Sequence, residues 1–347
     1  MKLHACFALG LTAATLAATS DGLVITLQLQ SKSFEEASVA VSPVRNVAVY
    51  LPPGYRESSS RYPTIYFLPN PLDGDYRSVF DHRNARELFD AAISAGAIGP
   101  FILVCPDMAT PLGSSWYVNS PVTGNWEDFM IDELVPRIDA QFRTLPRRDS
   151  RGIAGIFMGG YGAIRFGMRH PDVFGSVYAM HPVGTGSGIQ IMDSIPNWDV
   201  LAGATSQNDV RKDGASLIFT TIFQAFLPDS GRPPLFIDLP AHRDGDRLEI
   251  DSKLTAKLRD NFFLESMIPR YADNLKSLRA LRFDWSRADR NQDHVYANIA
   301  FTHKLNEFGI RHEAEEYNGA WGDANWGEDG RIRTEVLPFF ERHLSRD

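Results

Sequence analysis

The sequence predicts an α/β fold with a mostly parallel central sheet and helices on both of its faces. Along most of the 347 residues, short apolar runs alternate with amphipathic helical runs, which is the pattern of strands joined by crossover helices. Two of the short runs, 64–68 and 101–105, are almost continuously apolar. Such runs are typical of strands that are buried on both faces.

The first half of the chain begins with two strands that have no helix between them. Residues 23–30 and 47–51 alternate in side-chain character with a period of two, so we expect them to pair antiparallel at one edge of the sheet. Further strands are expected at 64–68 and 101–105. Helices are expected at 85–95, 126–142 and 161–170, with strands at 151–156 and 176–180.

The alternation stops after residue 181 and resumes near residue 280. Residues 182–275 contain Gly/Ser-rich and Pro-rich pieces and two helical runs, 215–226 and 248–263, so we interpret them as an insertion or cap over the sheet edge within a single domain, 21–347. The remaining elements are expected to be strands at 280–285 and 313–317 and helices at 294–308 and 331–344, with Asp293 as the N-cap of the first of these helices.

Residues 1–20 have the pattern of a secretory signal peptide. Lys2 and His4 precede an apolar run over 5–18, and small residues follow it. This predicts a secreted protein, extracellular or periplasmic; the alternative is a buried or frayed N-terminal helix. The net charge of −8 gives no support to nucleic-acid binding, and no later apolar run is long enough to span a bilayer.

A glycine-rich turn joins the strand at 151–156 to the helix that follows. Its sequence is Gly155-Ile156-Phe157-Met158-Gly159, and strand, sharp turn and helix with glycines on both sides of one residue is the layout of the nucleophile elbow of α/β-hydrolases. The middle residue of that motif is serine, whereas here it is phenylalanine. The alternative is a glycine-rich turn without chemistry.

The chain resembles the putative-esterase (esterase D-like) family of the α/β-hydrolase superfamily, which includes carbohydrate, feruloyl and acetylxylan esterases and mycolyl transferases. The resemblance covers roughly residues 40–345. It rests on four segments, 47–55, 117–124, the elbow with 161–163, and 170–174. It implies an α/β-hydrolase fold and a Ser, Asp or Glu, His triad in that chain order.

The triad positions implied by the resemblance are largely altered. Phe157 occupies the nucleophile position and Trp321 the histidine position, while Asp289 keeps the acid. A benzyl group is no nucleophile, and an indole accepts no proton at neutral pH. We expect Phe157 to sit at positive φ at a cost of about 1–2 kcal/mol, offset by stacking on Trp321. His181, which follows the strand after the elbow, is a speculative substitute base; the alternative is a loop-capping histidine.

The resemblance also implies where a ligand would bind. One oxyanion donor would be the backbone N–H of Met158, and the second would come from the loop with Asn70 and Pro71, although proline has no N–H to donate. Separately from the resemblance, the rings and carboxylates at 321–329 predict one wall of an aromatic cleft; the alternative is a packed surface loop. The full set of expected binding residues is Asn70, Pro71, Tyr117, Asn119, Met158, Tyr161 and Trp326.

These features predict a protein that has lost triad hydrolysis but keeps a pocket for an ester, acyl or carbohydrate-type molecule. One alternative is an active carboxylic-ester hydrolase that uses an unrecognised nucleophile, or a water activated by His181 or Asp289. Another is a non-catalytic interaction module. His242, His303 and His312 lack the spacing of a zinc site, and we expect neither a metal nor a cofactor.

Overall fold

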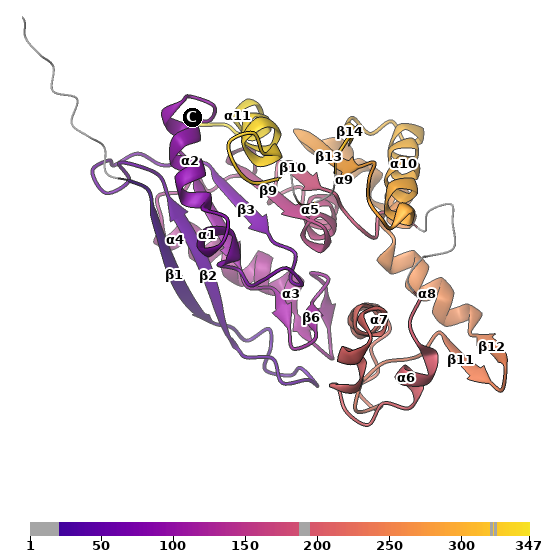
Figure 1. Cartoon of the computed structure of the whole chain (residues 1–347). Helices are drawn as coiled ribbons and strands as arrows, with labels where there is room; N and C mark the ends of the chain where they lie inside the picture. The colour runs from indigo at the N-terminus through magenta and orange to yellow at the C-terminus, as the bar shows by residue number, and fades with distance from the viewer. Residues whose placement is uncertain (1–20, 187–194, 320–321, 323–324) are drawn as a thin grey trace, which may run out of the picture.

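A computed structural model describes residues 21–186, 195–319, 322 and 325–347. Its centre is an eight-stranded sheet with the order β1-β2-β4-β3-β9-β10-β13-β14, seen in Figure 1. β1 pairs antiparallel with β2 and β2 with β4, and all later pairs are parallel. The strands are β1 Leu23–Gln30, β2 Val44–Leu51, β3 Thr64–Leu68, β4 Ile102–Pro106, β9 Arg151–Ile156, β10 Ser176–Met180, β13 Ala280–Ser286 and β14 Glu313–Tyr317.

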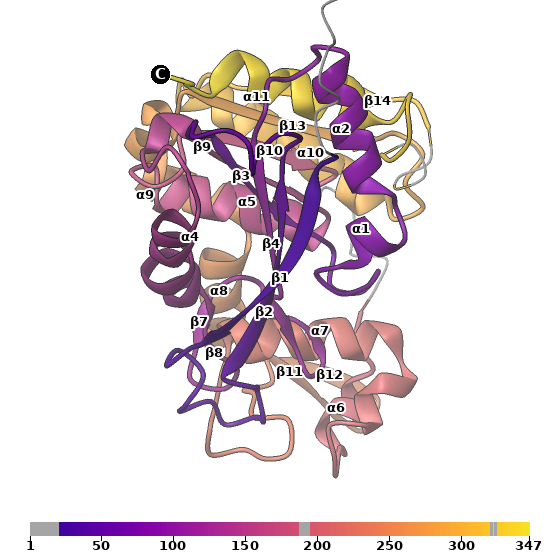
Figure 2. The same cartoon turned by 90° about the vertical axis from the view of Figure 1, so that its left-hand side faces the viewer.

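Helices cover both faces of this sheet, as Figures 1 and 2 show. α5 packs on β9 and β10 from one face, and α11 contacts β10 from the other. The alternation of side chains makes this visible in β10, where Val177 lies against Gly167 of α5 and Tyr178 packs edge-on against Phe339 of α11. The covering helices are α1 Ser78–Asp81, α2 Ala85–Ser94, α3 Trp126–Asp128, α4 Val135–Gln141, α5 Met158–Arg169, α10 Gln292–Glu307 and α11 Leu337–His343.

Shorter elements complete the main body. α3 runs into α4 through a π-helical stretch, Phe129–Leu134, and a second π-helical stretch, Ile332–Val336, precedes α11. A 3-10 turn at Arg148–Ser150 leads into β9. Two small two-stranded sheets lie outside the main sheet and are made of β5 Ala109–Thr110 with β6 Gly113–Ser114, and β7 Asn119–Ser120 with β8 Gly124–Asn125.

The segment between β10 and β13 begins with a group of elements beside the sheet, from α6 to α8, and ends with α9, which packs against α5 and α10 (Figure 1). It contains α6 Trp198–Ala202, a 3-10 turn at Asp209–Lys212, α7 Gly214–Phe226, a hairpin of β11 Ala241–Asp244 and β12 Arg247–Ile250, α8 Ser252–Phe262 and α9 Leu264–Ser277. In the described part of the chain, we find no helix that is both long and apolar enough to cross a membrane.

The structure confirms the predicted fold class and the antiparallel edge, and it corrects three details. Residues 248–250 belong to strand β12 and not to the helix predicted over 248–263, because the chain turns back at Gly245. The helix after the elbow begins at Met158, three residues earlier than predicted. α9 was not predicted as a separate helix, since Pro269 interrupts its pattern.

Candidate active site

The elbow backbone has the strained geometry that its glycines predict. Phe157 lies between β9 and α5 with φ 57° and ψ −115°. A Cβ on Gly155 would collide with the carbonyl of Gly159, and a Cβ on Gly159 would collide with the carbonyl of Leu68. Only residues without a side chain permit this close approach of helix and strand. The turn therefore keeps the form of a nucleophile elbow.

The ring of Phe157 is buried and stacks on an imidazole. It is 6% exposed, and it lies on His181 with ring centroids 4.9 Å apart and planes 26° apart. Aromatic stacking of this kind contributes about 0.5–1.5 kcal/mol, which offsets part of the positive-φ cost. The contact expected between Phe157 and Trp321 concerns a residue outside the described part of the chain.

His181 is a buried structural histidine. It follows β10 at φ 45° and is 1% exposed. Its Nδ1 accepts a hydrogen bond of 2.9 Å from the backbone N–H of Ser286, so the ring proton must be on Nε2, which lies 2.8 Å from Asp289 Oδ2 and donates to it. The lone pair of Nδ1 accepts the N–H of Ser286, and Nε2 carries the ring proton. Neither ring nitrogen of His181 can therefore take a proton from a substrate or a water. This corrects the prediction that it could replace the triad histidine.

Asp289 is the acid to which two imidazoles donate. It is 3% exposed, and its Oδ2 lies 2.8 Å from His181 Nε2 and 2.8 Å from His294 Nδ1. Its Oδ1 accepts the N–H of Asn291 at 2.9 Å. Burial opposes ionisation, but the hydrogen bonds from His181 and His294 outweigh it and hold the pKa of Asp289 well below its usual value. The carboxylate is therefore ionised at neutral pH.

His294 is the imidazole that faces open space, and the sequence analysis did not select it. It lies in the first turn of α10 and its side chain is 27% exposed. The helix is capped by Asn291, whose side-chain oxygen accepts from the N–H of Asp293 at 3.2 Å, so the predicted N-cap at Asp293 is wrong. The available signal was a histidine five residues after Asp289, in the first turn of the next helix.

The cluster of His181, Asp289 and His294 has the residue types of a metal site, with ligand atoms within 4.8 Å of one another. Its hydrogen bonds do not fit that role. A metal on His181 Nε2 would need the ring proton on Nδ1, which instead faces the N–H of Ser286. The cluster is therefore better described as a carboxylate that orients two imidazoles.

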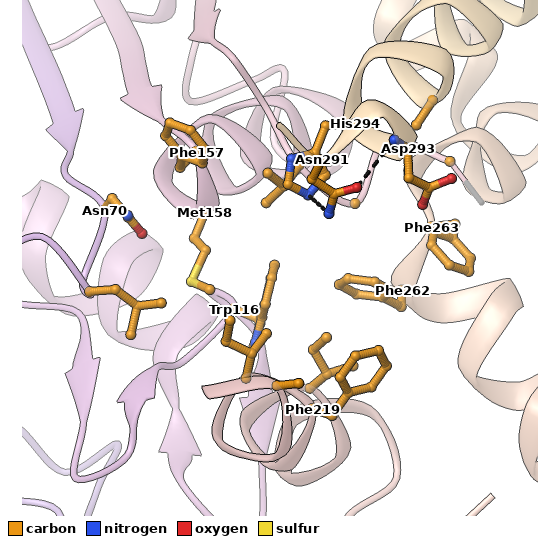
Figure 3. Close-up of a pocket in the computed structure, with 18 of the residues that line it drawn as sticks. Asn70, Trp116, Phe157, Met158, Phe219, Phe262, Phe263, Asn291, Asp293 and His294 are labelled. Atoms are coloured by element: carbon orange, nitrogen blue, oxygen red, sulfur yellow. Dashed lines mark hydrogen bonds between the residues drawn. The ribbon is translucent and has the colours of Figure 1, made fainter. Parts of the chain in front are cut away.

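A cavity of about 300 Å³ opens beside this cluster and separates the elbow from α7 and α8 (Figure 3). Most of its wall is hydrocarbon, and its polar groups are few. The lining residues are Asn70, Leu72, Asp73, Trp116, Phe157, Met158, Val183, Gly184, Gly186, Ala215, Ile218, Phe219, Ile222, Phe262, Phe263, Asn291, Asp293, His294 and Ala297. An apolar pocket with a small number of polar groups is the usual form of a small-molecule site.

Some of the residues predicted for binding lie at this cavity or next to it. Asn70 and Met158 line it, and Asn70 is 6% exposed. Trp326 lines a neighbouring, more polar hollow of about 420 Å³ that also contacts Asn70, and its ring packs edge-on against Phe67 at 5.9 Å.

The other predicted binding residues do not line the cavity. The Tyr161 hydroxyl donates to the carbonyl of Phe262 at 2.9 Å, and the Tyr117 hydroxyl donates to the carbonyl of Pro69 at 3.2 Å. The Asn119 amide donates to Asp128 at 2.6 Å, and Pro71 borders a small separate hollow. The polar groups of Tyr161, Tyr117 and Asn119 thus hold neighbouring segments together and do not face the cavity.

The comparison with known families agrees with this geometry. The model of the "Putative esterase" family matches residues 38–326, which is most of the chain. The chain belongs to this family. It is 37% identical over 149 residues to an esterase of Mycobacterium tuberculosis, a match that covers 41% of this chain and 30% of that protein. It is 26% identical over 171 residues to the S-formylglutathione hydrolase of Mus musculus, covering 44% of this chain and 56% of the relative.

Solved structures of esterases share the fold of this family member. A ferulic acid esterase superposes with a TM-score of 0.63 at 19% identity, over 94% of this chain and 100% of that one. At this identity the structural similarity establishes the fold, while the activity has to be argued from the side chains of the site.

Proposed function

We propose that this esterase-family protein binds an uncharged apolar small molecule in the cavity beside the elbow and does not hydrolyse it through a serine triad. The observation that supports this most strongly is the side chain at the elbow. Phe157 has the backbone position of a nucleophile, but its ring is packed against His181 and forms part of the cavity wall. A triad enzyme has its reactive hydroxyl at this position, whereas this chain has the apolar ring of Phe157.

The lining favours an ester, acyl or aryl compound over a carbohydrate. Sugars need many hydrogen-bonding partners, whereas the walls of this cavity are mainly aliphatic and aromatic, with Ile218, Phe219 and Ile222 on α7 and Phe262 at the end of α8. Burial of an apolar ligand here would be favourable by about 25 cal/mol per Å² of apolar surface. We therefore infer that the apolar part of the ligand lies between α7 and the elbow.

Two measurements test this proposal. The first is hydrolysis of 4-nitrophenyl butyrate, for which we expect the unaltered chain to give no more than the buffer rate. A Phe157→Ser, Trp321→His variant, which restores the side chains expected at both triad positions, is the comparison. Clear turnover by the unaltered chain would contradict the proposal that it has lost ester hydrolysis.

The second measurement is binding of a non-hydrolysable apolar ligand, 4-butylanisole, by calorimetry. Ala297→Phe would fill the cavity, because Ala297 is buried and lines it, whereas Ala300→Phe changes a half-buried position on the same helix outside the lining. We expect the first substitution to abolish binding and the second to leave it unchanged. Equal binding by both variants would show that the cavity is not the site.

A second candidate function is hydrolysis by an activated water, and one observation favours it. The Asp289–His294 pair is a carboxylate-oriented imidazole at the edge of the cavity. A water could transfer a proton to His294 Nε2 while its oxygen forms a bond to the ester carbon; the ester C–O bond would then break, and the proton would pass from Nε2 to the departing alkoxide. Ester turnover that is lost in His294→Phe and kept in Phe157→Ala would favour this route.

An interaction module without a ligand has less support. Among the described residues, the exposed large apolar side chains are Val44, Leu72, Ile195, Leu248 and Ile250, and only the last two share an element. We further propose that the protein is secreted, since residues 1–20 have the pattern of a signal peptide. N-terminal sequencing of the protein recovered from the culture medium or periplasm tests this, and an intact Met1 would contradict it.

A further inference from the structure

Asn291 and His294 form the polar end of the cavity. Their hydrogen bonds determine the orientation of the Asn291 amide and which nitrogen of His294 carries a proton. The side-chain oxygen of Asn291 accepts from the N–H of Asp293 at 3.2 Å, and its Nδ2 lies 3.2 Å from His294 Nε2, as the dashed lines in Figure 3 show. Rotating the amide by 180° would place the Nδ2 donor of Asn291 against the N–H donor of Asp293. The amide nitrogen must therefore face His294.

The imidazole of His294 is fixed in the same way. Its Nδ1 lies 2.8 Å from the Asp289 carboxylate, so Nδ1 carries a proton and donates it. Nε2 then faces the amide nitrogen of Asn291 as an acceptor. The pair thus presents one N–H donor from Asn291 and one lone pair from His294 to the same edge of the cavity, joined by a long mutual hydrogen bond.

A hydroxyl group satisfies this pair better than any other simple oxygen group. A hydroxyl that approaches both side chains from the cavity can donate to Nε2 of His294 and accept from Nδ2 of Asn291. An ether oxygen and a carboxylate can accept hydrogen bonds but cannot donate one. Replacing their weak direct contact by two hydrogen bonds to one ligand oxygen costs neither side chain a partner.

The charge around the cavity works against anionic ligands. Asp73 and Asp293 line it, and the ionised Asp289 lies directly behind His294. No lysine or arginine is among the lining residues in the described ranges, and the segments outside those ranges contain a single lysine, Lys2, and no arginine. A carboxylate would lose its hydration here without gaining a counter-charge.

Asn70 adds an independent acceptor on the opposite wall. It is 6% exposed, it lines the same cavity, and its side-chain oxygen has no hydrogen-bond partner among the described residues. A buried carbonyl oxygen without a partner is rare and marks a place where a ligand or water donates. This second acceptor lies across the cavity from Asn291 (Figure 3).

We propose that the cavity selects uncharged, hydroxyl-bearing apolar compounds, such as alkyl phenols and alcohols, through His294 and Asn291, and that it rejects carboxylates. This inference rests on the proposed binding function and specifies its ligand class. Asn70 extends it, because a compound with a second hydroxyl at its far end gains another hydrogen bond.

Three compounds with the same butylphenyl body test the inference by calorimetry at neutral pH: 4-butylphenol, its methyl ether 4-butylanisole, and 4-butylbenzoate. We expect the phenol to bind about tenfold more tightly than the ether, which is the effect of one net hydrogen bond, and the benzoate to bind more weakly than both. His294→Phe keeps a ring of similar size but removes the acceptor, so it should bring the phenol to the level of the ether. His303→Phe, at an exposed position of the same helix, should leave the ratio unchanged.

The outcomes separate the two proposals. Equal affinity for phenol and ether, or tighter binding of the benzoate, would overturn the hydroxyl selection while the binding function stands. Failure of all three compounds to bind would remove the binding function itself. Because the three ligands are compared on the unaltered chain, the test does not depend on the folding of any variant.

Discussion

The Phe157 ring lies on the His181 imidazole, with centroids 4.9 Å apart, and this contact explains how a phenylalanine can occupy a nucleophile elbow. His181 is held by the N–H of Ser286 on one side and by Asp289 on the other, so it forms a fixed platform. The apolar ring on this platform lies between the elbow backbone and the His181–Asp289 pair. The residue at the centre of the elbow is thus part of the core.

The strain at Phe157 can be measured by comparing Phe157→Gly with Phe157→Ala. Both substitutions lose about 3–5 kcal/mol of packing, but we expect the glycine variant to be about 1 kcal/mol more stable than the alanine variant, because φ 57° and ψ −115° are strained for any residue with a Cβ. For the same two substitutions at Phe166, a buried position within α5, the order should reverse, since glycine is disfavoured in helices. Urea unfolding of the four variants checks this, and a more stable alanine variant at both positions would contradict it.

The close approach of α5 to the sheet makes Gly159 intolerant of any side chain. Gly159→Ala would place a methyl group against the backbone carbonyl of Leu68, which cannot move aside. We expect a loss of about 3 kcal/mol in the free energy of unfolding. Gly214→Ala is the matched control, because a Cβ there meets no atom within 4 Å. It should be neutral or slightly stabilising, and a similar loss in both variants would show that the elbow is not tightly packed.

The two hydrogen bonds of His181 should contribute more to stability than its ring. His181→Phe keeps an aromatic ring beside Phe157 but leaves the N–H of Ser286 and one acceptor of Asp289 without their partner. We expect a loss of about 2–4 kcal/mol, measured by denaturant unfolding. The exposed His303→Phe should change stability by less than about 0.5 kcal/mol. An unchanged stability in His181→Phe would mean that water replaces the imidazole.

Asp289 should make folding sensitive to acid. Its pKa in the folded protein is below its ordinary value, so its contribution is fully present above the unfolded pKa of about 3.9 and is lost as the pH falls toward the folded pKa. We therefore expect the difference in unfolding free energy between the unaltered chain and Asp289→Asn to shrink from about pH 5 to about pH 3. Asp172→Asn, at an exposed position, should show no such trend. A difference in unfolding free energy between the unaltered chain and Asp289→Asn that stays constant with pH would show that folding does not lower the pKa of Asp289.

Most of the fold follows from the sequence because the sheet strands are short, apolar and separated by clear helices. The predicted bounds of β3 and β10 coincide with the observed ones. The region between β10 and β13 was harder to predict, because β11 has no apolar alternation and β12 alternates over only four residues, with its apolar side chains exposed. Its helices pack on one another, and α9 also packs on α5 and α10, so local pattern alone does not separate α8 from α9.

The site was only partly predictable, for physical reasons. The glycines and the resemblance pointed to Phe157, Met158 and Asn70, and these three residues line one cavity. The sequence could not distinguish His181 from His294, since the choice depends on a positive φ at 181 and on the rotation of α10. Nor could it distinguish Asn291 from Asp293, because both residue types are good helix caps.

The retained shape of the elbow has an evolutionary consequence. Codons for phenylalanine and serine can differ by a single nucleotide, so one point mutation at Phe157 would place a hydroxyl on a turn whose backbone is already formed. The tryptophan codon shares no position with either histidine codon, so the base implied at Trp321 lies several mutations away. Under the proposed loss of the triad, a serine at 157 would therefore return in a single mutational step, whereas a histidine at 321 would require a change at every position of its codon.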